Sequence, residues 1–163
     1  MSTIYKNLSD FSDTTIPSAS GYRFGVVVSE WNQEITESLF EGVHQTLLKH
    51  GAEGEAITRI NVPGSFELTA GAGMLAEKGE YDAIICLGCV IQGETRHFDF
   101  ICDAVAAGLT QLTVRYNRPF VFGVLTPNTM QQALDRAGGK HGNKGDEAAV
   151  TAIKMAALQR KLS

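Results

Sequence analysis

Residues 88–100 read GCVIQGETRHFDF, the pattern of a buried strand that runs through a short polar turn into a helix. Backbone N–H groups in the first turn of a helix have no partner within the helix, and the helix dipole places partial positive charge there. A phosphate can therefore bind at such a turn without a dedicated lysine. His97 lies just beyond the turn, and its imidazole could act as a general acid or base. A lone histidine is usually structural, but the adjacent phosphate-type turn favours a catalytic role equally, so both interpretations stay open here.

A second segment, residues 136–145 (RAGGKHGNKG), is rich in glycine and carries fixed positive charges on Arg136, Lys140 and Lys144. The whole chain has a net charge of −4, so this local basicity suggests a small anionic ligand. A guanidinium matches phosphate through two parallel hydrogen bonds, which favours Arg136, although the helix dipole alone also favours a cation at a helix end. We do not expect nucleic acid to bind, because no longer basic tract with interleaved aromatic residues is present.

Aromatic and acidic side chains follow other expected strands. Trp31, the only tryptophan, lies in a strand-to-helix loop, where it could stack on a heteroaromatic ring or simply cover the edge of the core. Phe66 and Phe122 fit the core better than a ligand contact. Glu67 follows a Pro-Gly-Ser turn and could hold the hydroxyls of a polyol, but a solvated glutamate in a first helical turn explains it equally well.

The cysteines point away from metal and redox chemistry. Cys86 and Cys89 have the spacing of a redox pair or of half a zinc site, but residues three apart on a strand point to opposite faces and zinc would need a second pair. We interpret them as small buried hydrophobes and expect no metal. The odd cysteine count, with no secretory segment and no stretch of membrane-spanning length, favours a cytoplasmic protein that binds no membrane.

The 163 residues suffice for one domain with its own core. Short apolar, β-branched runs predict four strands, over residues 23–29, 56–62, 83–91 and 120–125. Apolar periodicity and capping residues predict helices around them: from Ile35 to Leu47, over 66–77, from Ile101 to Leu112, from a cap at Asn128 through Ala137, and over 146–162. Gly51 and Gly79 are expected just past the ends of the first two helices.

Strands that alternate with helices favour right-handed crossovers, and hence an α/β three-layer sandwich with a four-stranded parallel sheet. We expect a flavodoxin-like strand order. Ligands of such sheets bind beyond the carboxyl ends of the strands, so the loops after all four strands would meet at one edge. Residues 1–20 are predicted to form an arm before a single domain over 21–163. This arm could add a strand to the sheet of a neighbouring subunit.

Four motifs, in this order, closely resemble the lumazine synthase family: VPGSFEL at 62–68, GCVIQGETRHFDF at 88–100, FGVLTPN at 122–128 and DRAGGKHGNKGDEAA at 135–149. The resemblance runs from about Arg23 to the end of the chain. It implies the penultimate step of riboflavin biosynthesis, in which 5-amino-6-(D-ribitylamino)uracil and 3,4-dihydroxy-2-butanone 4-phosphate give 6,7-dimethyl-8-ribityllumazine, phosphate and water. The family requires no metal and no organic cofactor. A noncatalytic flavin- or lumazine-binding paralogue, or a flavodoxin-type electron carrier, would be the alternatives.

The resemblance also implies roles for single residues around the pyrimidine substrate. Trp31 would stack on the ring, and Phe122 would approach it from a neighbouring subunit. The ribityl chain and ring would be held by Ser65, Phe66 and Glu67. Main-chain groups of Cys89, Val90 and Ile91 would line the polar edge of the ring.

At the phosphate, the resemblance implies that the backbone of Glu94 and Thr95 acts with Arg136, and that His97 moves protons. His97 and Arg136 should therefore flank one anion pocket. The carboxylate of Glu94 departs from the family pattern and would repel an anion unless it faces away. Secondary candidates for the site are Asn32, Lys144 and Glu147.

The family further implies homopentamers with shared active sites, which in some members pack into a 60-subunit icosahedral shell. The loop over residues 139–144 is similar to that of the shell-forming members. Riboflavin synthase is the expected protein partner.

Overall fold

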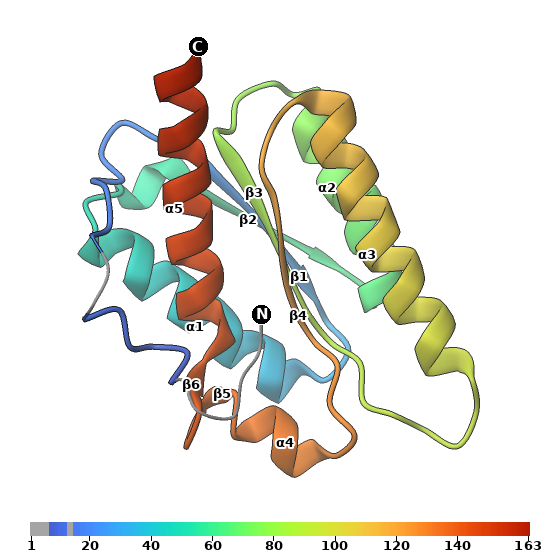
Figure 1. The fold of residues 1–163 in the computed structure, drawn as a ribbon. Helices are drawn as coiled ribbons and strands as arrows, with labels where there is room; N and C mark the ends of the chain where they lie inside the picture. Colours follow the sequence, from blue (N-terminus) through green and yellow to red (C-terminus); the bar gives the residue numbers. More distant parts are fainter. Residues whose placement is uncertain (1–6, 13–14) are drawn as a thin grey trace.

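The computed structural model describes residues 7–12 and 15–163. Four parallel strands form the central sheet in the order β2-β1-β3-β4 (Figure 1): β1 (Phe24–Ser29), β2 (Ile57–Val62), β3 (Ala83–Cys89) and β4 (Phe120–Leu125). Every residue of the central strands β1 and β3 is buried, as expected for parallel strands that are covered on both faces. This order is the flavodoxin-like one, so the predicted fold class is confirmed.

Two helical layers cover the sheet (Figure 1). Helices α1 (Gln33–Lys49) and α5 (Lys144–Leu162) lie on one face, and α2 (Leu68–Glu77) and α3 (His97–Tyr116) lie on the other. Val26 and Val28 pack into the core beneath α1 and α5, whereas Val27 packs into the core beneath α2 and α3. Cys86 and Cys89 also fall into different cores, which confirms that they point to opposite faces of the sheet.

Helix α5 begins at Lys144, two residues before the predicted start, because Asn143 caps it. The side-chain oxygen of Asn143 accepts the N–H of Gly145 at 2.7 Å, and its Nδ2 donates to the main-chain oxygen of Ser38 in α1 at 2.8 Å. A Cβ at position 145 would collide with the main-chain oxygen of Leu39. The absence of a side chain at Gly145 therefore allows α1 and the start of α5 to pack in close contact.

The predicted helix from Asn128 through Ala137 is wrong in both its cap and its length. Thr129 is the cap, since its Oγ1 accepts the N–H of Gln132 at 3.2 Å, and α4 spans only Met130–Leu134. The following residues form an antiparallel pair, β5 (Ala137–Gly139) and β6 (Gly142–Asn143). Gly138 and Gly142 have φ angles of 102° and 81°, which favour glycine and are not helical, so the predicted helix could not continue through this segment.

Helix α3 extends four residues beyond the predicted Ile101–Leu112 at each end, β4 has the predicted bounds, and the remaining boundaries differ by one or two residues. A 3₁₀ turn, η1 (Gly54–Ala56), delays β2 to Ile57, and a second one, η2 (Ser65–Glu67), precedes α2. Strand β3 ends at Cys89, so Val90 and Ile91 belong to the loop. Gly51 and Gly79 follow α1 and α2 with positive φ, as predicted.

The described part of the arm packs against its own chain. The N–H of Leu8 donates to the main-chain oxygen of His141 at 2.8 Å, and the N–H of Asn143 donates to Ser9 Oγ at 2.8 Å. Between residues 7 and 20, the described positions contain no strand, and residues 1–6 and 13–14 of the arm lie outside the described residues. None of the helices described is both long and apolar enough to cross a membrane.

Candidate active site

The loops after β1, β2 and β3 enclose a cavity of about 710 Å³ at the carboxyl edge of the sheet, here called the Trp31 cavity. A cavity of this size suits a small organic ligand. It is lined by nine residues that the sequence singled out and by three others: Trp31, Asn32, Ser65, Phe66, Glu67, Cys89, Val90, Ile91 and His97, with Gly64, Phe100 and Ile101.

Three large rings stand exposed around this cavity. Trp31 is 71% exposed, Phe66 56% and Phe100 65%. Exposed apolar side chains gathered in one patch indicate a binding surface. Phe100 and Ile101 are not among the predicted site residues, although they follow His97 by three and four positions on α3 and therefore share its helical face. That spacing was the signal by which they could have been found.

Ser65 lines the Trp31 cavity, and its hydroxyl oxygen, Oγ, has no hydrogen-bond partner among the described residues. Only 6% of the residue is exposed. A Cβ at Gly88 would lie 2.6 Å from this oxygen, so the bare glycine makes room for it. A buried hydroxyl without a partner costs free energy, which a bound polar ligand could recover.

His97 is the first residue of α3 and joins the Trp31 cavity to the turn before the helix. The main-chain N–H of His97 donates to Thr95 Oγ1 at 3.4 Å, so Thr95 adjoins the start of the helix. Glu94 and Thr95 are both exposed there. The dipole of this 20-residue helix favours negative charge at its N-terminus. A group for proton transfer and a turn suited to an anion are thus side by side.

A second cavity, here called the Arg136 cavity, lies at the carboxyl end of β4 and measures about 340 Å³. It contains three further residues that the sequence singled out, Phe122, Arg136 and Lys144. Its remaining lining comes from Leu8 of the arm, from β4 and the residues after it, and from Gln132 in α4.

The cations near the Arg136 cavity differ in how they are paired. Lys140 Nζ lies 3.1 Å from Asp135 and Lys144 Nζ lies 2.5 Å from Glu147. Arg136 Nη1 donates to the main-chain oxygen of Gln132 at 3.0 Å, and no described carboxylate pairs with Arg136. Of these three cations, Arg136 is therefore the one whose charged group is most available to an anion.

His97 and Arg136 do not line the same cavity in one chain. The expectation of a single pocket flanked by both is wrong for an isolated chain. His97 follows the interior strand β3, whereas Arg136 follows the edge strand β4 and the short α4, which carry it to a different surface. Phe122 and Lys144 lie with Arg136, and Glu147 is placed beside Lys144 outside the lining of both cavities.

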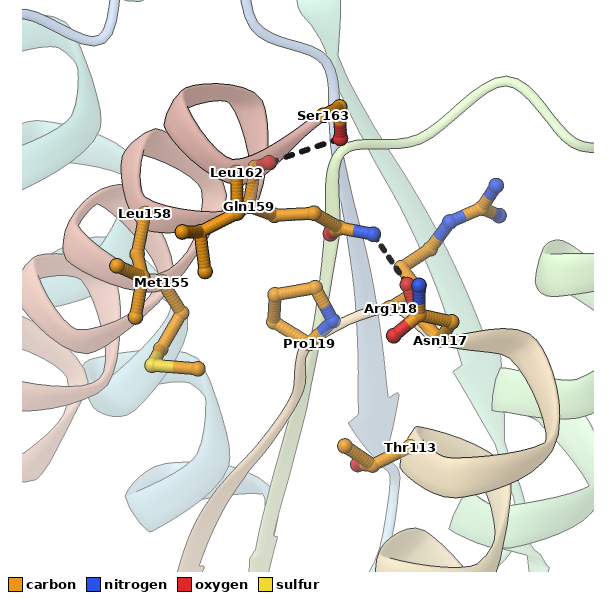
Figure 2. A pocket seen from close by; sticks show the side chains of 9 residues that line it. All are labelled: Thr113, Asn117, Arg118, Pro119, Met155, Leu158, Gln159, Leu162 and Ser163. Atoms are coloured by element: carbon orange, nitrogen blue, oxygen red, sulfur yellow. Dashed lines mark hydrogen bonds between the residues drawn. The ribbon is translucent and has the colours of Figure 1, made fainter.

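A third cavity, of about 350 Å³, lies between the C-terminal part of α5 and the end of α3 (Figure 2). It includes none of the residues that the sequence singled out. The cavity is lined by Met155, Leu158 and Leu162 of α5 and by Pro119. The side chain of Gln159 donates to the main-chain oxygen of Asn117. No three His, Cys, Asp or Glu side chains of the described residues gather as a metal site.

Comparison with known proteins decides the family. A family model for 6,7-dimethyl-8-ribityllumazine synthase matches residues 21–160. The chain belongs to the 6,7-dimethyl-8-ribityllumazine synthase family. A member from Cytophaga hutchinsonii is 61% identical over 157 residues, which cover 96% of this chain and 98% of the relative.

Other members of the family are nearly as similar. The 6,7-dimethyl-8-ribityllumazine synthase of Parabacteroides distasonis is 57% identical over 95% of this chain and 97% of its own length. That of Phocaeicola vulgatus is 51% identical over 99% of this chain and 96% of its own length. The matched span contains every residue that lines the Trp31 cavity and, apart from Leu8, every residue that lines the Arg136 cavity.

Proposed function

We propose that this chain condenses 5-amino-6-(D-ribitylamino)uracil with 3,4-dihydroxy-2-butanone 4-phosphate to 6,7-dimethyl-8-ribityllumazine. The family membership supports this reaction, and the observation that carries it is the composition of the Trp31 cavity. The cavity combines an exposed indole, the unpartnered hydroxyl of Ser65, the carboxylate of Glu67 and the imidazole of His97. These are the groups needed to stack a pyrimidine, hold a ribityl chain and move protons.

The chemistry needs acid–base groups at each step. The 5-amino group attacks the ketone carbon of the phosphate substrate, and loss of water gives an imine. Elimination then breaks the bond to phosphate, and the ribitylamino nitrogen closes the second ring with loss of water. We assign proton transfer to His97, and stacking on the pyrimidine to Trp31. No oxidant, reductant or cofactor enters this balance.

The ring would be held by the main chain of Cys89, Val90 and Ile91, and the ribityl chain by Ser65, Phe66 and Glu67. All six residues line the Trp31 cavity. We assign the phosphate to the main-chain N–H groups of Glu94 and Thr95. Exposure of both residues leaves the Glu94 carboxylate free to face solvent while its N–H contributes.

The guanidinium of Arg136 completes the phosphate site from a second copy of the chain. We infer that the Arg136 cavity of one subunit, with Phe122 and Lys144, faces the Trp31 cavity of the next. The assembly proposed is a homopentamer, with a 60-subunit shell as the higher form. Among the described residues, the edge strand β4 pairs only with β3, so its other side could accept the arm of a neighbour.

The chain is proposed to work in the cytoplasm, and riboflavin synthase is the partner that would consume its product. The experiment that tests the function is to mix the two substrates with the protein and to record lumazine absorbance and phosphate release together. Both signals should rise in a one-to-one ratio. A paralogue that only binds flavin or lumazine would give neither signal, and an electron carrier would hold a flavin that is reversibly reduced.

A further inference from the structure

Asn32, directly after Trp31, has an unusual backbone conformation. Its φ and ψ angles are 57° and 49°, in the left-handed region. Asn117 is the only other non-glycine residue with positive φ among the described residues. Asparagine tolerates this region better than other residues with a side chain. Although asparagine is a favoured helix cap, the side chain of Asn32 makes no capping bond to α1.

The side chain of Asn32 instead crosses to β3. Its Nδ2 donates to the main-chain oxygen of Cys89 at 2.9 Å, a contact between residues 57 positions apart in the chain. Strands β1 and β3 pair as far as Val28 and Leu87. The Asn32 amide donates to β3 beyond these last paired residues, where β1 no longer supplies a main-chain N–H. Cys89 is 1% exposed, so its carbonyl has little access to water.

This bond joins two of the segments that line the Trp31 cavity. Trp31 lies on the loop that Asn32 holds, and Val90 and Ile91 directly follow Cys89. The indole is 71% exposed, so packing within the chain does little to fix its position. The conformation of Asn32 and its bond to Cys89 are the described features that set the indole relative to the main chain of residues 89–91.

We propose that Asn32 is a positioning residue, which sets the gap between the indole of Trp31 and the main chain of Cys89–Ile91 without binding substrate itself. The ring that enters this gap is the pyrimidine of the proposed reaction, so the catalytic part of the inference rests on that proposed function. The placement of the indole does not, because it can be measured without ligand.

The test uses three variants of the full chain. Asn32→Gly keeps access to the left-handed region and removes the amide, whereas Asn32→Asp keeps the side-chain size but replaces the amide donor by a charged carboxylate, which cannot donate to the Cys89 carbonyl. Asn117→Gly is the matched control, since it makes the same change in the same backbone conformation at the far end of α3. Because Trp31 is the only tryptophan, the anisotropy of tryptophan emission reports directly on the mobility of its indole.

Both Asn32 variants should lower this anisotropy in the absence of ligand. They should also raise the KM for the aminopyrimidine about tenfold, the effect of a lost hydrogen bond to a buried carbonyl, and leave the KM for the sugar phosphate within about twofold. Quenching of Trp31 by 6,7-dimethyl-8-ribityllumazine should weaken by the same factor. Asn117→Gly should change none of these values.

Unchanged anisotropy in folded Asn32→Gly and Asn32→Asp would overturn the proposal, as would an equal rise in both KM values. If Asn32→Gly fails to fold, Asn32→Asp alone decides by the same criteria. A wild-type chain that makes no lumazine would refute the proposed function, while the ligand-free anisotropy would still test the role of Asn32.

Discussion

His97 and Arg136 line separate cavities of one chain, the first at the start of α3 and the second beyond the edge strand β4. If both act on one substrate, each site must take His97 from one subunit and Arg136 from the next. Interfaces of this head-to-tail kind close into rings, in which every subunit contributes to two sites. Subunits that lack different halves of the site should therefore complement each other.

We expect His97→Ala and Arg136→Ala subunits to recover activity when they are dissociated, mixed in equal amounts and reassembled. A complete site needs an intact His97 from one subunit and an intact Arg136 from the next. Each is present in half of the subunits, so random mixing makes about one site in four complete. Wild-type mixed with the double variant should also give about a quarter of the wild-type rate. If the site lay within one chain, the first mixture would show no recovery and the second would retain about a half.

The two single variants should fail in different ways. His97→Ala should lower kcat by about 10²-fold and leave some turnover, because positioning of the two substrates persists without the proton shuttle. Arg136→Ala should be the more damaging change and should raise the KM for the sugar phosphate, with Arg136→Lys only partly active because an ammonium lacks the bidentate geometry. Steady-state kinetics with each substrate varied in turn measure this.

Lys140→Ala serves as the control for those kinetics. Its ammonium pairs with Asp135 and lines neither cavity, so both KM values should stay at the wild-type level. An Arg136→Ala chain with normal kinetics would remove Arg136 from the phosphate site.

The fold, and nine of the twelve residues that line the Trp31 cavity, could be predicted from the sequence. Apolar runs such as residues 83–89 identify buried strands, and the sheet rule then places Trp31, Ser65 and Val90 at one edge. The separation of His97 from Arg136 could not be predicted in the same way. It depends on Thr129, not Asn128, capping a helix of only five residues, and on the glycines that turn the chain into β5 and β6.

The hydrogen bond from Asn32 to Cys89 also could not be predicted from the sequence. It needs a left-handed residue at the start of α1 and an unpaired carbonyl at the end of β3, and nothing within either segment specifies the other. Phe100 is different, because its three-residue spacing from His97 in the sequence is enough to place both on one helical face.

Cys89 should be chemically inert despite its place in the Trp31 cavity. Burial raises the pKa of its thiol to about 12, so the sulfur stays protonated at neutral pH and is a poor nucleophile. Iodoacetamide at pH 8 should alkylate Cys89 far more slowly in the native protein than in the urea-unfolded chain, as measured by peptide mass spectrometry. Equal rates in both states would contradict this assignment.

Glu37 and Arg59 should make stability depend on pH in the acid range. The Arg59 guanidinium donates to both carboxylate oxygens of Glu37, at 2.8 and 2.5 Å, and stacks 4.4 Å from the ring centre of Phe40. The hydrogen bonds from Arg59 hold the pKa of Glu37 below its ordinary value. A lowered carboxyl pKa stabilises the fold above the unfolded pKa, near 4.3, and this stabilisation is lost as the pH falls through the folded pKa.

We therefore expect Glu37→Gln to lower the melting temperature at pH 7 and to have little effect near pH 3, because the wild-type carboxyl is then losing its charge as well. The Glu37 side chain is 42% exposed, so solvent screening limits the effect to about 0.5–1 kcal/mol, a few degrees at most in a chain of this length. Glu41→Gln, on the same helix but hydrogen-bonded to Gln45 and not to a cation, is the matched control and should change little at either pH. A Glu37→Gln deficit that is equal at both pH values would show that the charge on Glu37 is not what stabilises its contact with Arg59.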